Sequence, residues 1–289
     1  MKLPPRLSSH VLIAPPYLWF VVSAISRYLG PSFAVLLFEQ LDVLGVAWFR
    51  ITSAAIIFAF WTKPWRTIRA ANRQTIALLL SLGACLALMN SAFYLAINRL
   101  PLSLVATMEF VGTIAIALFG LKAMRNYIAL ALAIAGVMAL IKTQWSNDLL
   151  GLSFATINAL LFTTYIVLGH RVSQQGASEG VEQLGVAMAA AFVFIWPIGI
   201  WDATSALTNP RLILAGIGVG VCSSVVPYVC DQLAMAQMTR NTYAVLLALL
   251  PAMAALIGAV VLGQIPTIRD TYGVLLVMTG VALHRPKSL

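Results

Sequence analysis

The sequence predicts an all-α polytopic membrane protein with ten transmembrane helices. Of its 289 residues, 61% are hydrophobic and only 9% are charged, whereas soluble domains carry about 25% charged residues. Apolar runs long enough to cross a bilayer recur along the whole chain, separated by short loops. The ten expected segments are residues 14–38, 43–61, 75–98, 101–120, 126–143, 149–169, 182–202, 212–238, 241–263 and 267–283.

The distribution of Lys and Arg predicts the orientation. If both termini are cytoplasmic, twelve basic residues lie on the inner side and four on the outer side, with Arg27 and Arg50 inside helices. Positive charge accumulates on the cytoplasmic side of membrane proteins. We therefore expect a multi-pass protein of a bacterial inner membrane, with both termini in the cytoplasm. The basic residues form short clusters rather than a continuous face, so a nucleic-acid partner is not expected.

An internal repeat predicts two halves. Residues 96–140 and 236–283 each run from a polar turn through a long apolar helix and a polar loop to an A-G-V or T-G-V helix end. Each is the fourth and fifth helix of a five-helix half. Five is odd, so the second half enters the membrane from the opposite side, as in the inverted repeats of secondary transporters. We expect repeats at 1–145 and 146–289 within one transmembrane domain.

The chain is organised around Leu88–Phe119, where two apolar runs meet at Arg99 and Pro101. The first run carries Asn90, and the second carries Glu109 near its middle. A carboxylate at that depth costs about 2.5–3.5 kcal/mol on insertion scales. These two helices are therefore expected to flank a polar cavity inside the membrane.

Polar side chains recur at helical spacing on other segments, as at Ser224, Tyr228 and Asp231 on the eighth. The inventory suits a small zwitterion: a carboxylate receives an ammonium, amides or hydroxyls receive a carboxylate, and rings with Met sulfur form an adaptable wall. The expected substrate-binding residues are Tyr28, Met89, Asn90, Phe93, Tyr94, Met108, Glu109, Asn158, Tyr165, Ser224, Tyr228 and Asp231. Pro31 and Pro227, which interrupt helices at mid-depth, are expected gating positions.

A structural role competes with this interpretation. Glu109 or Asp231 could instead pair permanently with Arg27 or Arg50 and lock helices together. For Arg50 we favour the structural role. The GxxxG spacing of Gly216 and Gly220 is interpreted as close helix packing.

No enzyme chemistry is expected. The chain has no P-loop, no cluster with metal-ligand spacing and, inside the expected membrane segments, no histidine that could act as base for a serine. The three cysteines lie in apolar runs and are interpreted as packing residues. We expect no cofactor and no bound metal.

Over nearly its whole length, and most specifically in the third and fourth segments, the chain resembles the EamA-type carriers of the drug/metabolite transporter superfamily. Within the superfamily it resembles the bacterial threonine/homoserine exporters, with aromatic amino acid exporters as close relatives. The matching motifs are L-M-N at 88–90, F-Y-L at 93–95, L-P-L at 100–102, M-E-F-x-G at 108–112, A-L-F at 117–119, S-S at 223–224, V-P-Y at 226–228, Phe60 and K-P-W-R at 63–66. The chain departs from the family's usual Glu-Pro and Gly-Glu of the ninth helix at Leu250-Pro251 and Gly263-Gln264. The resemblance implies ten helices and export of amino acids or related metabolites by alternating access.

The leading hypothesis is an inner-membrane secondary transporter that exports amino acids, threonine- or homoserine-like and also aromatic, and works as a monomer among membrane lipids. A drug, nucleotide-sugar or other metabolite carrier is the alternative within the class. An integral membrane enzyme acting on lipids and a structural or assembly protein are the alternatives outside it. Polar groups at mid-depth on several helices favour transport, because enzymes of that kind cluster their groups at one membrane face.

Overall fold

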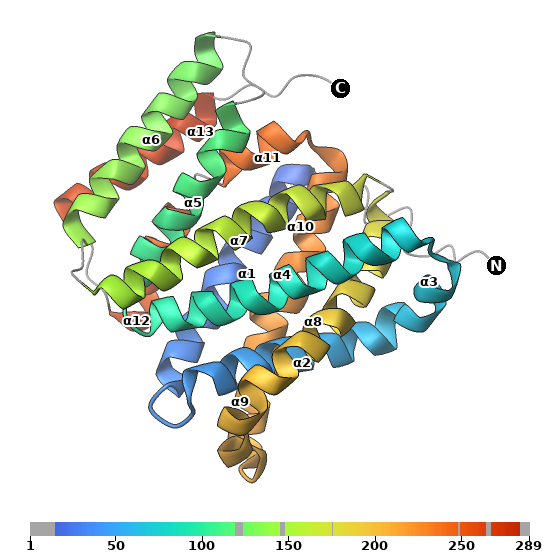
Figure 1. Ribbon diagram of the computed structural model, residues 1–289. Helices are drawn as coiled ribbons and strands as arrows, with labels where there is room; N and C mark the ends of the chain where they lie inside the picture. The colour runs from blue at the N-terminus through green and yellow to red at the C-terminus, as the bar shows by residue number, and fades with distance from the viewer. Residues whose placement is uncertain are drawn as a thin grey trace.

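The computed structural model describes residues 15–118, 124–144, 148–174, 176–247, 249–263 and 267–283. Across these ranges the chain is helical, with no strand, and every expected segment is helical where it is described. Both termini and the expected repeat boundary at 145/146 lie outside the described residues. The helices, drawn in Figure 1, are α1 (Pro16–Leu37), α2 (Val43–Thr62), α3 (Pro64–Ala70), α4 (Arg73–Ile97), α5 (Leu102–Leu118), α6 (Met124–Gln144), α7 (Leu149–Ser173), α8 (Ala177–Leu207), α9 (Pro210–Gly220), the π-helical turn η2 (Val221–Val225), α10 (Val226–Gln237), α11 (Arg240–Leu246), α12 (Leu249–Leu262) and α13 (Ile268–Leu283).

Seven helical stretches of the described residues are long and apolar enough to cross a membrane. They are Pro16–Leu37, Val43–Thr62, Arg73–Ile97, Leu149–Ser173, Ser178–Thr204, Pro210–Gln237 and Thr242–Leu262. Helix α5 has 17 residues, which at about 1.5 Å per residue fall just short of a typical hydrocarbon core. The fold is thus that of an all-helical, multi-pass membrane protein.

Local sequence explains where several helices begin and end. Lys63 takes a left-handed conformation (φ 52°) that ends α2, and Pro64 follows in the first turn of α3, where its missing N–H is harmless. The Asp148 carboxylate caps α7 by accepting the Gly151 N–H at 2.9 Å, and the Arg99 guanidinium donates to it at 3.1 Å. The Gly151 N–H and then Arg99 lower the pKa of this exposed carboxyl group.

Two expected segments are interrupted, and a proline accounts for each interruption. A proline lacks the N–H that bonds the carbonyl four residues earlier, and its ring clashes with that carbonyl. Residues 241–263 divide into α11 and α12 just before Pro251. Residues 212–238 divide into α9, η2 and α10 around Pro227, where the Val226 N–H bonds the Val221 carbonyl in π-helical register. Discontinuous helices at membrane depth occur where the backbone is buried in protein or lines a cavity.

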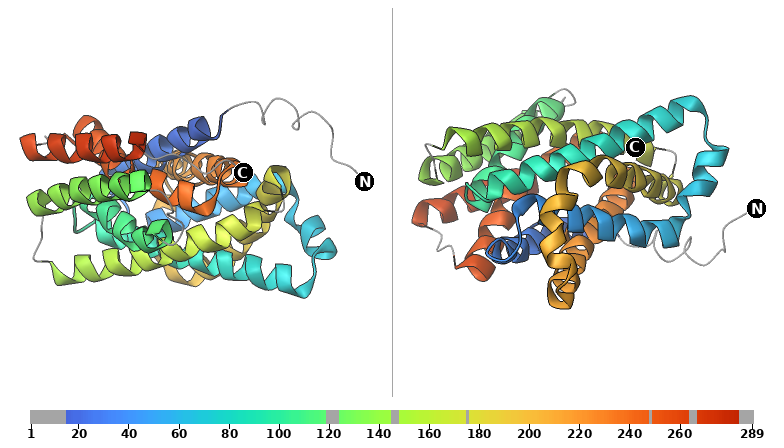
Figure 2. Two further views of the ribbon diagram at one scale, coloured as in Figure 1. Left: turned by 90° about the horizontal axis from the view of Figure 1, so that it is seen from above. Right: turned by 60° about the horizontal axis from the view of Figure 1, so that its bottom comes forward.

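The helices pack in pairs that join distant parts of the chain. Helix α2 lies against α8 and α9, α4 lies between α7 and α8, and α1 contacts η2, α10 and α12. Helix α5 packs on α7, α11 and α12. Helices α6 and α13 pack on each other at one end of the molecule, opposite the end that holds α3 (Figure 2).

Glycines permit the closest of these contacts. A Cβ at Gly45 of α2 would lie 2.7 Å from the Asp202 carbonyl oxygen of α8, and one at Gly199 of α8 would lie 2.6 Å from the Leu44 carbonyl oxygen of α2. Small residues let membrane helices approach in this way. Gly216 and Gly220 likewise face α2, with the Phe49 and Ser53 side chains within 3.0 Å of an added Cβ. The packing role predicted for the GxxxG spacing is confirmed.

Replacement of Gly199 by alanine is expected to destabilise the protein by about 1–3 kcal/mol, because the new methyl group would collide with backbone of α2. Gly218→Ala is the matched control, since nothing lies within 4 Å of a Cβ there, and it should be neutral or stabilising. Thermal unfolding of both variants in detergent tests this expectation. Equal midpoints would show that α2 and α8 adjust to the added methyl group.

Candidate functional site

The Asp231 carboxylate of α10 collects four donors from three other helices. The Arg27 guanidinium and the Ser23 hydroxyl, both on α1, donate to it. The hydroxyls of Tyr165 on α7 and Tyr243 on α11 each donate at 2.7 Å. Asp231 is 1% exposed and Arg27 is 6% exposed, so this is a fully desolvated ion pair. Such a pair is tolerated only where further hydrogen bonds complete it.

The Arg27 guanidinium is enclosed by aromatic rings. Its central carbon lies 5.3 Å from the ring centroid of Phe162, 5.9 Å from that of Tyr165 and 5.8 Å from that of Tyr228. The faces of aromatic rings attract cations, and more strongly in the absence of water. The rings therefore help to keep Arg27 charged inside the protein.

Glu109 of α5 has a different environment, although it too is buried at 4% exposure. The Asn158 side-chain amide of α7 donates to one carboxylate oxygen at 2.8 Å, and the Tyr28 hydroxyl of α1 donates to the other at 3.2 Å. No arginine or lysine nitrogen of the described residues lies within 4.0 Å of it. The single oxygen of the Asn158 amide, Oδ1, is buried, and no described residue donates a hydrogen bond to it. Glu109 is therefore held by neutral groups, beside an unused acceptor.

Arg50 of α2 is the complementary case, a buried cation (3% exposed) with neutral partners. Its Nε donates to the Ser224 hydroxyl at 2.8 Å, and Nη2 donates to the Ser223 carbonyl at 2.6 Å. That carbonyl is the one that Pro227, four residues later, leaves without its helical N–H. Across the described chain no carboxylate lies within 4.0 Å of Arg50. The Tyr94 ring lies 5.5 Å from its guanidinium carbon.

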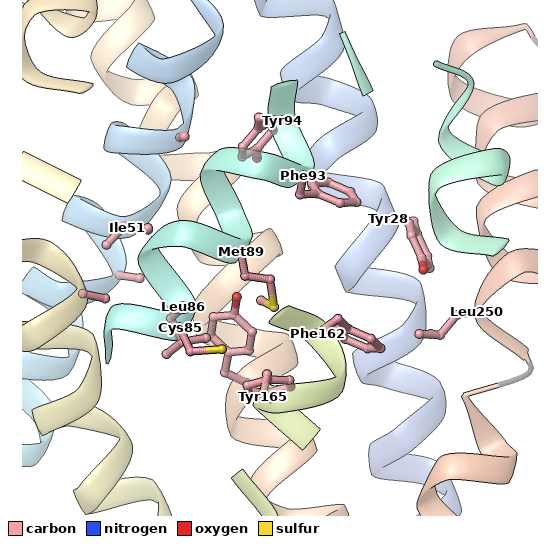
Figure 3. Packing of buried hydrophobic residues seen from close by; sticks show 14 of the residues in the cluster. Tyr28, Ile51, Cys85, Leu86, Met89, Phe93, Tyr94, Phe162, Tyr165 and Leu250 are labelled. Atoms are coloured by element: carbon pink, nitrogen blue, oxygen red, sulfur yellow. The ribbon is translucent and has the colours of Figure 1, made fainter. Parts of the chain in front are cut away.

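The remaining polar contacts connect these clusters. The Asn90 amide of α4 donates to the Tyr228 hydroxyl at 3.0 Å, and the rings of Tyr228 and Tyr165 lie 5.6 Å apart. The Tyr94 hydroxyl is buried, and no hydrogen bond joins it to any residue in the described part of the chain. Figure 3 shows Tyr94, Met89, Phe93 and Tyr165 among the buried residues that surround this region.

The structure places the sequence-predicted residues in one buried region, contributed by α1, α4, α5, α7, η2 and α10. All of them are buried except Met108, which is half-buried against the core. Of the ion pairs that the sequence left open between Glu109 or Asp231 and an arginine, the structure contains Arg27–Asp231. Neither Arg27 nor Arg50 forms the alternative ion pair with Glu109. Three residues were missed: Ser23, Phe162 and Tyr243. Ser23 and Arg27 lie one turn apart on α1, and that spacing was the one available signal.

The two expected gating prolines belong to elements that contact each other: Pro31 lies in α1, which packs on η2, and Pro227 follows η2. Pro31 is buried in α1 directly after Gly30, where an added Cβ would lie 2.0 Å from the Ser223 hydroxyl oxygen. Pro227 follows η2 at the start of α10. Helix α1 continues through Pro31 without interruption, whereas the segment around Pro227 is interrupted by η2, and α1 contacts η2.

An apolar cavity of about 440 Å³ lies apart from this polar region. It is open on one side, lies between α4 and α7, and carries no polar side chain; its lining is Leu88, Ala92, Leu95, Phe154, Ile157, Leu160 and Leu161. Since none of these residues belongs to the polar clusters, it is not part of the candidate site.

A polar, charge-balanced core inside an all-helical membrane fold is typical of a secondary transporter, and comparison with known proteins agrees. The EamA-like transporter family matches residues 149–284. A solved crystal structure with 14% sequence identity superposes on 92% of this chain and 96% of its own, with a TM-score of 0.65. That likeness shows the fold.

Curated relatives extend the match over most of the chain. The threonine/homoserine exporter RhtA of Salmonella typhimurium (strain LT2) is 31% identical over 255 residues, which cover 86% of this chain and 84% of the relative. RhtA of Escherichia coli (strain K12) is 31% identical over 253 residues, with the same coverage. The chain therefore belongs to the EamA-type carriers of the drug/metabolite transporter superfamily, and it is a transporter rather than an enzyme.

Replacement of Asp231 by asparagine is expected to lower the free energy of unfolding by about 3–5 kcal/mol, because Arg27 would remain buried without its anion. Ser23→Ala, which removes one neutral donor to the same carboxylate, should cost less, about 1.5–3 kcal/mol. The double variant Arg27→Met with Asp231→Leu should recover stability relative to Asp231→Asn. Thermal unfolding in detergent ranks the three variants. Similar midpoints for Asp231→Asn and Ser23→Ala would contradict a structural role for the ion pair.

Proposed function

We propose that this protein is an inner-membrane secondary transporter that exports amino acids by alternating access. The proposed cargo is threonine- or homoserine-like, with aromatic amino acids also accepted. The observation that carries the proposal is the pair of buried charges of opposite sign, Glu109 and Arg50, that neutral groups alone hold. An amino acid carries one charge of each sign, so it complements both.

Glu109 supplies the ammonium subsite in this proposal. Its carboxylate and the unused Oδ1 of Asn158 offer acceptors on neighbouring helices α5 and α7. In place of the structural role that the sequence favoured for it, Arg50 is proposed to supply the donor for the substrate carboxylate, with Ser224 beside it. The rings of Tyr94, Phe93 and Tyr228 and the thioether of Met89 form an apolar wall that suits side chains of different size. The relatives' printed name, threonine/homoserine exporter, supports this substrate class.

Helix packing supports the proposed ten helices in two inverted repeats, 1–145 and 146–289. In such a repeat the third segment is equivalent to the eighth, and the first to the sixth. The third segment packs on the sixth (α4 on α7), and the equivalent contact, of the eighth segment on the first (α10 on α1), is also present. The fourth packs on the sixth (α5 on α7), and its counterpart is the ninth on the first (α12 on α1). When the two halves are interchanged, each of these helix contacts therefore maps onto another contact that the structure contains. This is expected for repeats related by a pseudo-two-fold axis.

Alternating access gives the helix interruptions a role. The proposed substrate residues are buried, so cargo enters only when helices move apart. Pro31 in α1 and Pro227 after η2 lie where the first half meets the second. We propose that α1 and α10 bend at these points while each half moves largely as a unit. The protein is proposed to work as a monomer in the lipid bilayer with both termini cytoplasmic.

Purified protein in proteoliposomes is expected to catalyse counterflow of radiolabelled threonine or homoserine. Because both charges of the substrate are used, N-acetylthreonine, which lacks the ammonium, and threonine amide, which lacks the carboxylate, should compete at least about tenfold less well. Phenylalanine tests the aromatic cargo. Liposomes without protein are the control. Equal competition by threonine, N-acetylthreonine, threonine amide and phenylalanine would contradict the proposal and favour another metabolite as cargo. Absence of counterflow with any amino acid would do the same.

Glu109→Gln is expected to weaken threonine binding about tenfold or more, since a charge-assisted hydrogen bond is lost, while the unfolding midpoint stays near that of the wild type. The stability is retained because no buried cation loses its partner. Binding is measured by scintillation proximity, and unfolding by a thermal scan of the same sample. A variant that unfolds readily yet still binds threonine would return Glu109 to a structural role.

A further inference from the structure

Gln232 of α10 is a buried amide outside the polar clusters described above. Its side chain is 0% exposed, and neither its nitrogen nor its oxygen has a hydrogen-bond partner among the described residues. Because both atoms are without a partner, exchanging the assigned nitrogen and oxygen positions does not change this. Most buried polar groups of native proteins are hydrogen-bonded. An amide that lacks both of its bonds therefore points to a partner that arrives from outside the chain.

Three helices meet around this amide. Helix α10 packs on α7 and on α8, and these two also contact each other. A Cβ at Gly169 of α7 would lie 3.5 Å from Nε2 of Gln232, and one at Gly180 of α8 would lie 3.0 Å from its Oε1. The amide therefore lies between two glycines of different helices, which leave room for it. Separation of α7 and α8 from α10 would uncover it.

Gln232 extends the polar face of α10 away from the polar core. It lies one turn after Tyr228 on that helix. Gly169, beside it, comes eleven residues after Asn158, which is about 16 Å along the axis of α7. Asn158 binds Glu109, so one amino acid is too short to contact Glu109 and Gln232 together. In the proposed orientation the end of α7 and the start of α8 lie on the cytoplasmic side, and Gln232 is on that side of the core.

We propose that Gln232 is a second binding point for the amino acid, at the cytoplasmic entrance to the polar core. This inference rests on the proposed function. When α7 and α8 part from α10, the amide becomes accessible from the cytoplasm. Its N–H groups donate to the substrate carboxylate and its oxygen accepts from the ammonium, so one side chain complements both ends of a zwitterion. The cargo then moves on to Glu109 and Arg50.

The unpaired state of the amide also favours opening on this side. Contact among α7, α8 and α10 deprives Gln232 of hydrogen bonds, which costs free energy. Opening restores them, first from water and then from the substrate. The amide therefore stabilises the cytoplasm-open state relative to the closed one. An amide with a structural role would instead hold the three helices together, so the effect of its removal on stability separates the two roles.

Threonine counterflow measured from each side of the membrane tests the proposal. Membrane vesicles that contain the full-length protein are prepared everted, with the cytoplasmic face outward, and right-side-out. Both are loaded with unlabelled threonine and diluted into radiolabelled threonine. Gln232→Met, which keeps the unbranched shape without the amide, should raise the half-saturating threonine concentration about tenfold in everted vesicles and by less than about twofold in right-side-out ones. Its unfolding midpoint in detergent should equal or exceed that of the wild type.

The matched control is Gln237→Met on the same helix. Gln237 is half-buried, and its amide donates to the Leu233 carbonyl of its own helix at 3.0 Å. This control should leave half-saturation unchanged in both kinds of vesicle. Gly180→Ala reaches the Gln232 amide from α8, since the new methyl group crowds Oε1. It should act in the same direction as Gln232→Met and decides the question if that variant does not fold.

Three results would overturn the entrance site and leave the proposed export intact. They are an equal rise in half-saturation from both sides, no change from the cytoplasmic side, and a lowered unfolding midpoint with unchanged half-saturation. Each would make Gln232 a packing residue. Absence of threonine counterflow by the wild type from either side would instead refute the proposed function, and the entrance site with it.

Discussion

The structure depends on how four buried charges are compensated where no water is available. Arg27, Arg50, Glu109 and Asp231 are each at most 6% exposed, and lipid offers no hydrogen bonds to them. The protein pairs one cation directly with one anion and holds the other two apart with neutral groups. The first pair joins α1 to α10, and so connects the two halves of the chain. In the proposed function, Arg50 and Glu109 are the two charges that bind the ligand.

The neutral partners of Arg50 come from a helix interruption that would weaken a soluble helix. Pro227 removes an N–H from α10, and the Ser223 carbonyl freed by it accepts from Arg50. The same proline thus accounts for the π-helical turn and for part of the solvation of a buried cation. Gly30 allows α1 to approach this turn closely, because a side chain there would meet Ser223. The irregular backbone at η2 therefore also supplies a hydrogen-bond partner to the buried charge of Arg50.

Much of this could be predicted from sequence because hydropathy and helical spacing act locally. The apolar runs gave the helical segments to within a few residues, and polar spacing identified the faces of α4, α7 and α10. Partnerships between helices were less accessible. Arg27 with Asp231 and an arginine with Glu109 were both compatible with the sequence, since neither composition nor spacing places one helix against another. Tyr243 was missed because its contact with Asp231 depends on how α11 lies against α10, which the spacing of residues does not indicate. The ten crossings and the inverted repeat remain predictions.

Helix α1 contributes consecutive residues to both carboxylates: Arg27 binds Asp231 and Tyr28 binds Glu109. Neighbouring residues of an α-helix point about 100° apart, so α1 stands between the two acidic groups as a shared wall. Rotation or tilt of this one helix changes both sets of bonds at once. A movement of α1 that breaks the Tyr28 bond to Glu109 therefore also displaces Arg27 relative to Asp231. The chain would in this way carry a mechanical link between the state of the ligand site and the contact that holds its two halves together.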